Sequence, residues 1–330
     1  MKKNLLYIEN DSIDVYFNFA LEYYLTTEKT FEDSTVLLFW RTSPTLMVGK
    51  FQNTLEEINQ KYVEEKNIRL VRRMSGGGTI YTDLGGWQYS FITKAEGDQI
   101  RFQEYIEPVI QALSGLGIDA RFNGRNDLVI DGKKFSGTAQ YMHNGFVVHH
   151  GSLLFGTDLE EMVKSTTVSQ YKIISKGIKS VRDRVTNISD HLQQPIGIQE
   201  FKELMVSSLI GETGQRYSLN KNDIERIRVI AAEKFNNWDS IYGKNPKCNI
   251  IREGHFPGGN MEIRLDVKNN RILDAAIYGD FFGQLSQSEI RQALIDCSYS
   301  REELEQALGR LELNKTLYNI SSEEILNTII

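Results

Sequence analysis

Cysteine is scarce in this sequence of 330 residues, with only Cys248 and Cys297 present. Two isolated cysteines supply neither a disulfide framework nor the paired spacing of a metal site. No apolar stretch reaches the roughly 18 residues that a membrane-spanning helix requires. The amino-terminal run meets Glu9 too early for a secretory signal. We therefore expect a cytoplasmic protein in a reducing environment, with no membrane partner.

An excess of basic charge is also missing, because 38 lysines and arginines face 44 aspartates and glutamates, for a net charge of −6. This balance argues against a general nucleic-acid-binding protein, whose surface is basic. The sequence has neither a GxxxxGK[ST] phosphate loop nor an HExxH zinc motif. Residues 115–120 match the pattern GxGxxA, but they close a predicted helix instead of opening one, so we reject a dinucleotide site there.

The most informative stretch that is present runs from Val71 to Asp83 and reads Val-Arg-Arg-Met-Ser-Gly-Gly-Gly-Thr-Ile-Tyr-Thr-Asp. Two predicted strands flank its three consecutive glycines. Glycine adopts positive φ readily and lets main-chain N–H groups approach a ligand, and N–H groups turned inward bind anions. Arg72 and Arg73 add fixed positive charge. The stretch predicts an anion-binding loop, and the alternative is a tight turn with two surface arginines.

A second informative stretch, residues 123–139, contains the hairpin signal Asp131-Gly132 between alternating runs. A two-residue turn predicts that Asp127 lies opposite Ser136 and that Asp127 and Lys134 share a face as diagonal neighbours, about 7–8 Å apart. These two residues form either a surface ion pair or a phosphate-binding cation beside a metal-binding acid. The residues alone leave both interpretations open.

The strand predicted after the Asn144-Gly145 turn contains two adjacent histidines, His149 and His150, whose side chains must point to opposite faces. They therefore do not share one metal, and a buried, hydrogen-bonded histidine is preferred over a catalytic one. Residues 165–187 have no regular period and are rich in Ser, Thr, Lys and Arg. A segment of this length is either functional or disordered, and its basic residues would suit closure over a polyanion.

The length of the chain favours two domains, and the turn-rich segment 236–246 is the predicted boundary. In the first part, Thr54 followed by Glu57 forms a capping box that predicts a helix to about Asn67. The second part reads as a small α+β module. Its predicted strands cover residues 248–253, 260–267 and 271–279, and its predicted helices cover residues 286–297, 301–311 and 322–329.

Several of these stretches together resemble the lipoate–protein ligase A family. The motifs Arg-Arg-x-Ser-Gly-Gly-Gly, Gly-Arg-Asn-Asp with Lys-x-Ser-Gly-x-Ala, His-His-Gly-Ser-Leu-Leu and Lys-Gly-Ile-x-Ser-Val-Arg-x-Arg-Val-Thr-Asn occur in that family's order and spacing. Ile241-Tyr-Gly-Lys and Phe256-Pro-Gly-Gly extend the resemblance over nearly the whole chain. It implies an α+β fold of the biotin/lipoate ligase type, with a mixed-sheet catalytic domain at residues 1–245 and a small α+β accessory domain at residues 246–330.

The resemblance implies a two-step reaction in which lipoate and Mg-ATP give lipoyl-AMP and pyrophosphate. The lipoyl group then passes to a lysine of an acceptor protein, either a lipoyl domain or a glycine cleavage H-like protein. Matching positions make Lys134 the catalytic residue and Asp127 the Mg²⁺ contact. The implied ATP contacts are Arg73, Gly78, Thr79, Ile80, Tyr81, Asn126, Asp127 and Lys134. The implied lipoate contacts are Arg72, Gly77, Lys134, His149 and His150, and the loop over the adenylate carries Lys176, Lys179, Arg182 and Arg184.

One segment departs from the family, because Thr82-Asp-Leu-Gly-Gly86-Trp87 stands where His-Asp-Leu-Gly-Asn is usual. The departure bears on acyl specificity and on the acceptor. An acyltransferase that works through a cysteine thioester is disfavoured, because residues 1–247 contain no cysteine. A biotin ligase is disfavoured because its Gly-Arg-Gly-Arg-x-Gly loop is absent. The remaining alternatives are a cysteine-independent homologue that acts as an acyltransferase and a non-catalytic regulator that binds lipoyl domains.

Overall fold

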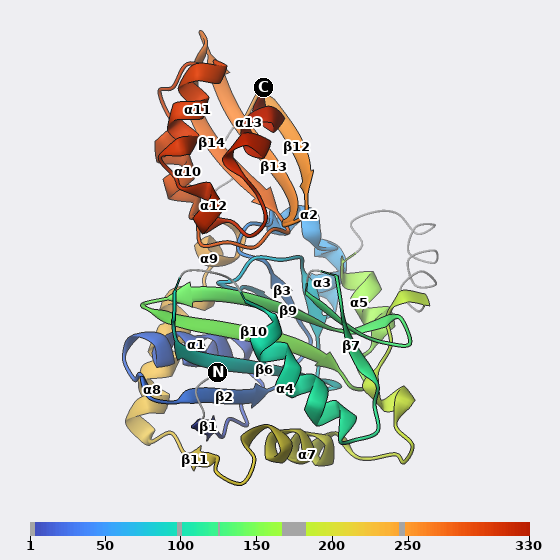
Figure 1. Ribbon diagram of the computed structural model, residues 1–330. Helices are drawn as coiled ribbons and strands as arrows, with labels where there is room; N and C mark the ends of the chain where they lie inside the picture. The colour runs from blue at the N-terminus through green and yellow to red at the C-terminus, as the bar shows by residue number, and fades with distance from the viewer. Residues whose placement is uncertain (1–3, 98–100, 125, 167–182, 244–247) are drawn as a thin grey trace.

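The computed structural model of this protein describes residues 4–97, 101–124, 126–166, 183–243 and 248–330. Figure 1 shows two lobes, a larger one built on a wide sheet with helices on both sides and a smaller one, in orange and red, formed by the end of the chain. This is the α+β architecture that the sequence predicts. None of the helices in the described ranges is both long enough and apolar enough to cross a bilayer.

The strands described in the larger lobe are three to eleven residues long, and three of them are buried along their whole length. In chain order they are β1 (Leu5–Ile8), β2 (Thr35–Trp40), β3 (Thr45–Val48), β4 (Arg69–Arg72), β5 (Ile80–Thr82), β6 (Gly86–Lys94), β7 (Ala120–Asn123), β8 (Asp127–Ile130), β9 (Lys133–His143), β10 (Phe146–Leu154) and β11 (Gln215–Tyr217). Its helices are α1 (Val15–Thr27), α2 (Thr54–Glu57), α3 (Gln60–Glu65), α4 (Gln103–Ser114), α5 (Leu159–Thr166), the 3₁₀ helix η1 (Ile188–His191), α7 (Ile198–Ile210), α8 (Lys221–Ile230), the π-helix η2 (Ala231–Phe235) and α9 (Trp238–Tyr242).

Among the described residues, eight strands form one mixed sheet in the order β11-β1-β2-β6-β10-β9-β8-β7, and a small sheet has the order β4-β3-β5. The first three strands are parallel, and the others pair antiparallel. Two tight turns connect the strands that carry the predicted site. Asp131-Gly132 and Asn144-Gly145 all have positive φ, between 48° and 76°, as type I′ hairpin turns require. Both turns are therefore confirmed.

Side chains alternate across the large sheet and feed two separate cores. On β2, Leu37 and Phe39 face the core under α4 and α7. The next residues, Leu38 and Trp40, face the core under α1 and α8. Met47 of the small sheet joins this second core. The space between α1, the large sheet and the small sheet is where the functional site lies.

The predicted capping box at Thr54 is wrong. Helix α2 ends at Glu57, α3 starts at Gln60, and the residue before α2 is Asn53. The Thr54 hydroxyl instead donates to the Ile241 carbonyl and accepts from the Arg72 guanidinium. The Thr54 side chain, which the local sequence predicts to cap the helix, therefore makes a long-range contact instead.

The smaller lobe packs helices against an antiparallel sheet with the order β12-β13-β14. Its core is a separate cluster that also includes Phe51 of the larger lobe. The turn between β13 and β14 is Asn269-Asn270, both at positive φ, as predicted. The elements are β12 (Ile250–Phe256), β13 (Gly259–Lys268), β14 (Arg271–Gly279), α10 (Gln287–Leu294), α11 (Arg301–Gly309), α12 (Leu313–Thr316) and α13 (Ser322–Ile329).

Candidate active site

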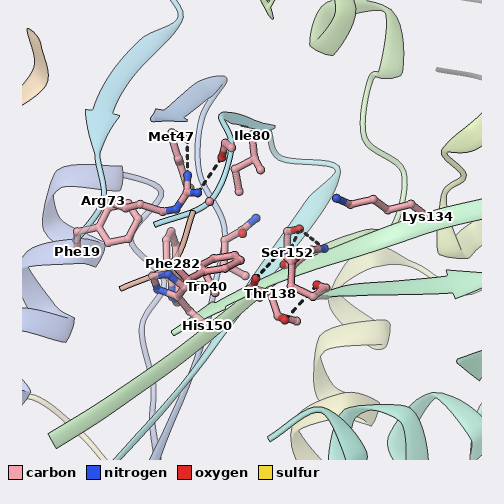
Figure 2. A pocket seen from close by; sticks show the side chains of 17 residues that line it. Phe19, Trp40, Met47, Arg73, Ile80, Lys134, Thr138, His150, Ser152 and Phe282 are labelled. Carbon is pink, nitrogen blue, oxygen red and sulfur yellow. Dashed lines mark hydrogen bonds between the residues drawn. The ribbon is translucent and has the colours of Figure 1, made fainter. Parts of the chain in front are cut away.

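A pocket opens between α1, the large sheet and the small sheet, with about 530 Å³ of space that is partly open to solvent. The apolar part of the lining comes from Phe19, Trp40, Met47, Ile80, Ala139 and Phe282, and the polar part includes Arg73, Asn126, Lys134, His150 and Ser152. Figure 2 shows Lys134 reaching toward the pocket from the side opposite Arg73 and Phe19. The pocket therefore combines a slot for an apolar chain with fixed positive charge.

Arg73 holds the glycine loop in place from the inside. Its guanidinium donates to the carbonyls of Met47 (2.7 Å), Gly76 (2.9 Å) and Gly78 (2.7 Å). The side chain is buried, and burial lowers the pKa of Arg73 to about 10, so it stays charged at neutral pH. No carboxylate within the described residues pairs with it at 4.0 Å or less. Its charge is therefore available to attract an anion in the pocket.

Gly76 and Gly77 meet the smaller lobe directly. The Gly77 N–H donates to the Phe281 carbonyl (3.1 Å), and Gly77 has a φ of +94°. A Cβ on Gly76 would lie 2.0 Å from the Phe281 carbonyl oxygen. Phe282 follows into the pocket wall, where its ring meets Phe102 edge-on with 5.3 Å between ring centroids. The glycines therefore admit a backbone neighbour from the second lobe as well as shaping the pocket.

Lys134 and Asp127 form an ion pair at the other side of the pocket, with 2.7 Å between Nζ and Oδ1. The predicted register is wrong by one residue, because Asp127 lies opposite Gly137 and not Ser136. A β-bulge between Leu128 and Val129 causes the shift. A Cβ on Gly137 would lie 3.4 Å from both Cε and Nζ of Lys134. The Lys134 side chain therefore passes directly over Gly137.

The two histidines lie on opposite faces of β10, as predicted, and both are buried. His150 lines the pocket and lies 2.7 Å from the Ser75 hydroxyl through Nε2. His149 faces the other core, where it stacks on Tyr105 with 4.9 Å between centroids and neither ring nitrogen has a hydrogen-bond partner among the described residues. Burial, together with the nearby His150, holds the pKa of His149 well below its usual value of 6.5. Of the two histidines, only His150 lines the pocket and is placed to contact lipoate.

Of the thirteen predicted site residues that the structure describes, seven line one pocket: Arg73, Gly77, Gly78, Ile80, Asn126, Lys134 and His150. Thr79 and Tyr81 lie outside the lining because side chains alternate on either side of Ile80. The Thr79 hydroxyl donates a hydrogen bond to the Gln52 side chain, and Tyr81 packs in a different core. Asp127 reaches the pocket only through its pair with Lys134.

Arg72 points away from the pocket. Its guanidinium donates to the carbonyls of Gly49 (2.9 Å), Gln52 (2.6 Å) and Ile241 (2.8 Å). Burial lowers the pKa of Arg72 to about 10, and its donors join the loop at residues 49–52 to helix α9. The expectation that Arg72 lies beside the lipoyl carboxyl is therefore not met by the geometry.

The predicted loop is described only at its end. Lys176, Lys179 and Arg182 lie outside the described residues, and Arg184 is exposed. The following residues pair with the strand of Lys134: Val185 forms a parallel bridge with Lys134, and the Thr186 N–H donates to the Lys134 carbonyl (2.9 Å). This end of the loop therefore lies beside Lys134.

Sequence reasoning missed the residues that form the slot, chiefly Phe19, Trp40, Met47 and Phe282. They come from four separate parts of the chain, and no local motif marks them.

The structure also shows where the unusual residues Thr82 and Trp87 lie. Thr82 accepts from the pocket residue Gln88 (2.8 Å), whereas the Trp87 indole donates to the Ile198 carbonyl in the opposite core. Trp87 therefore adds no bulk to the pocket.

Comparison with known proteins identifies this combination of fold and pocket. The family model for the lipoyl protein ligase A/B catalytic domain matches residues 14–210, and the model for the bacterial lipoate protein ligase C-terminus matches residues 245–329. These matches define the class as lipoyl protein ligases. A relative named lipoate-protein ligase LplJ, from Bacillus subtilis, is 41% identical over 98% of this chain and all of its own length. The chain belongs to the lipoate–protein ligase family.

Solved structures agree with this assignment. A bi-partite lipoate protein ligase from Thermoplasma acidophilum, solved in a study of that ligase and its E2 lipoyl domain, aligns with a TM-score of 0.65 and 26% identity, over 76% of this chain and all of the other. A lipoate-protein ligase A bound with ATP aligns with a TM-score of 0.62 and 25% identity, over 74% of this chain and 99% of the other. The α+β fold expected for this family is confirmed.

Proposed function

We propose that this protein joins lipoate to ATP as lipoyl-AMP, releases pyrophosphate, and transfers the lipoyl group to a lysine of an acceptor protein. The observation that carries the proposal is the pocket itself, whose apolar slot and buried positive charge lie within one cavity. Membership of the ligase family supports the reaction, and the ATP-bound relative supports the nucleotide. We also propose that residues 1–245 form the catalytic domain and residues 246–330 the accessory domain.

The slot suits an acyl chain with a dithiolane ring. Phe19, Trp40 and Phe282 offer aromatic surface, which contacts sulfur favourably, and Met47 and Ile80 add apolar surface. His150 and Gln88 add polar groups to the same lining. With the acyl chain among these residues, the carboxylate would reach the side of the pocket that Lys134 enters.

The adenylation step brings the carboxylate of lipoate onto the α-phosphorus of ATP, so that a new C–O–P linkage forms and pyrophosphate leaves. Two anions must approach each other, and the resulting repulsion is the main electrostatic barrier. Lys134 offers a mobile ammonium, Arg73 a fixed charge, and Gly78 a main-chain N–H group. In the second step the acceptor amine attacks the acyl carbon, AMP leaves with the electron pair of the C–O bond, and the amine loses a proton.

The residues present could hold Mg²⁺ only together with the phosphates of the substrate. Within the described residues no group of three or more His, Cys, Asp or Glu side chains could hold a metal alone. Mg²⁺ commonly binds through one or two carboxylates together with substrate phosphates, and Asp127 beside Lys134 supplies one such carboxylate. When bound, the ion would neutralise phosphate charge. Asp127 meanwhile orients the Lys134 ammonium.

The acceptor we propose is a lipoyl domain or a glycine cleavage H-like protein, and the compartment is the cytoplasm. The E2 lipoyl domain studied with the archaeal ligase supports the first choice. Residues 183–187 run beside Lys134, which supports a role for the preceding loop, with Lys176, Lys179 and Arg182, in covering the adenylate. A loop that closes over a reactive anhydride protects it from water.

The experiment combines two readouts on one sample with lipoate, ATP and Mg²⁺. Pyrophosphate release reports adenylation, and the mass of each acceptor in a panel reports lipoyl transfer. Release together with a lipoyl adduct on at least one acceptor is the expected result. Pyrophosphate release without any adduct would reject the transfer step for the acceptors tested. Neither release nor adduct would support the non-catalytic regulator instead.

A further inference from the structure

A buried line of polar side chains joins the glycine loop to the floor of the pocket. Arg73 Nε donates to the Ser75 hydroxyl (3.2 Å), and Ser75 Oγ lies 2.7 Å from Nε2 of His150. Nδ1 of His150 lies 3.3 Å from both carboxylate oxygens of Glu22. Ser75 and Glu22 are fully buried. All four side chains are therefore buried, and the line runs from Arg73 and the glycine loop, which we call the anion end of the pocket, to helix α1.

The hydrogens in this line have one consistent direction. Arginine has only donors, so the Ser75 oxygen accepts from Arg73 and its own hydrogen can point to Nε2 of His150. A neutral His150 then carries its hydrogen on Nδ1 and donates it to Glu22. The same carboxylate accepts from the hydroxyls of Ser90 (2.5 Å) and Tyr141 (3.3 Å).

The line also joins two buried ionisable side chains, Glu22 and Arg73. In the described part of the chain, no lysine or arginine nitrogen lies within 4.0 Å of Glu22, and no carboxylate lies that close to Arg73. Isolated buried charges are costly. Ser75 and His150 are the groups that connect them, so each depends on the other for its placement.

We propose that Ser75, His150 and Glu22 act as a single positioning relay for the Arg73 guanidinium and for the pocket face of His150. Glu22 fixes the tautomer and the ring plane of His150, and Ser75 passes that constraint to Arg73. The acyl slot and the anion end are thereby set by one network. The relay rests on the proposed reaction for its purpose, but its geometry can be tested independently of catalysis.

The kinetic test is a double-mutant cycle with Ser75→Ala and Glu22→Gln. Residues that act as a unit are not additive. We expect each single variant to lower kcat/KM for lipoate-dependent pyrophosphate release about tenfold, and the double variant to lose about tenfold as well, instead of about a hundredfold. Additive losses would overturn the relay, and so would single variants that stay within about twofold of the wild type.

Tyr141→Phe is the matched control, because it removes a hydroxyl from the same carboxylate without cutting the line between Glu22 and Arg73. Tyr141 does not line the pocket. We expect this variant to retain the activity of the wild type within about twofold, and to leave the effect of Ser75→Ala unchanged. A loss as large as that of Glu22→Gln would mean that the carboxylate matters only for packing, which overturns the relay.

The second readout is the protonation of His150, measured by nitrogen-15 NMR on histidine-labelled protein, with His150→Gln to assign the signal among the five histidines. We expect the neutral Nδ1–H tautomer at neutral pH, and a change to Nε2–H in Glu22→Met. An Nε2–H or doubly protonated His150 in the wild type would overturn the relay. This measurement needs no turnover, so it judges the relay even if the wild type releases no pyrophosphate, a result that would count against the proposed function alone.

Discussion

Adjacent residues with the same side chain have different surroundings in this protein. Arg72 and Arg73 follow each other in the sequence, yet Arg72 ties the backbone of residues 49–52 to helix α9, whereas Arg73 faces the pocket. The strand alternates, so one of the two had to turn away. Sequence alone could predict that they separate, but the direction depends on carbonyl groups from residues 49–52 and Ile241 that no local pattern brings together.

At this scale the first prediction concerns Lys134. Lys134→Ala should lower lipoate-dependent pyrophosphate release by about two to three orders of magnitude, because it removes a positive group from the developing anionic centre. The fold should be unaffected, since a half-exposed ion pair is worth only about 0–1 kcal/mol. The measurement is pyrophosphate release together with the melting temperature.

Lys133→Ala is the control for that substitution, because it removes the same charge from the neighbouring position of the same hairpin. Lys133 does not line the pocket. Activity within about twofold of the wild type is expected for this control. Normal release from Lys134→Ala would show that Lys134 has no part in adenylation.

The second prediction at this scale concerns His149. Its ring nitrogens are buried without hydrogen-bond partners among the described residues, and an unsatisfied buried polar group costs about 1–3 kcal/mol. His149→Phe should therefore raise the free energy of unfolding while leaving pyrophosphate release unchanged. Denaturant unfolding at pH 7.5 measures this difference, and a destabilised variant would indicate that the ring is hydrogen-bonded after all.

The same substitution should change the response to acid. The pKa of His149 is lowered in the folded state, so below about pH 6.5 the unfolded chain takes up a proton that the folded chain does not. Stability from this group is complete above pH 6.5 and declines as the pH falls. The stability gained by His149→Phe should thus be larger at pH 5 than at pH 7.5. An equal gain at both values would contradict the pKa shift.

At the scale of elements, the hairpin of β8 and β9 separates what local sequence can predict from what it cannot. The turn at Asp131-Gly132 was predictable, because positive φ at both positions favours these residues. The bulge was not, because it arises where Phe135 is drawn into the core. Thr54 is a second case in which a long-range contact overrides the local signal, because its hydroxyl bonds to the Ile241 carbonyl instead of capping the helix.

The glycine loop allows a prediction at this scale. Gly76→Ala would place a methyl group 2.0 Å from the Phe281 carbonyl oxygen, so the loop and the small lobe must separate. We expect a larger radius of gyration in small-angle scattering and slower pyrophosphate release. Gly78→Ala is the control for the scattering, since the nearest atom to its Cβ would be 4.0 Å away. An unchanged radius in Gly76→Ala would show that the loop adjusts locally.

On the scale of the whole molecule, the pocket is complete only when distant parts of the chain meet. Helix α1, the two sheets of the larger lobe and the segment after β14 each contribute a wall. Motifs predicted the family and the two lobes, because the signals for those features are local. The slot was not predictable from the same evidence, since Phe19 and Phe282 become neighbours of one cavity only through the fold.

Phe282 gives the prediction at this scale. Phe282→Ala should raise the KM for lipoate by about tenfold or more, because truncating a buried aromatic ring removes a wall of the slot. The KM for ATP should change much less. Phe282→Leu should recover most of the loss, since it refills the volume. Steady-state pyrophosphate release with each substrate varied measures this, and equal effects on both substrates would contradict a role in the acyl slot.

The contribution of Phe282 to the pocket has a consequence for synthesis of the protein. While a ribosome is still making the chain, the larger lobe emerges first, with its sheets and its glycine loop but without the ring that closes the slot. A nascent chain therefore has no finished chamber for the fatty acid. The chain would be able to form and hold lipoyl-AMP only near the end of translation, when the smaller lobe packs against the larger one.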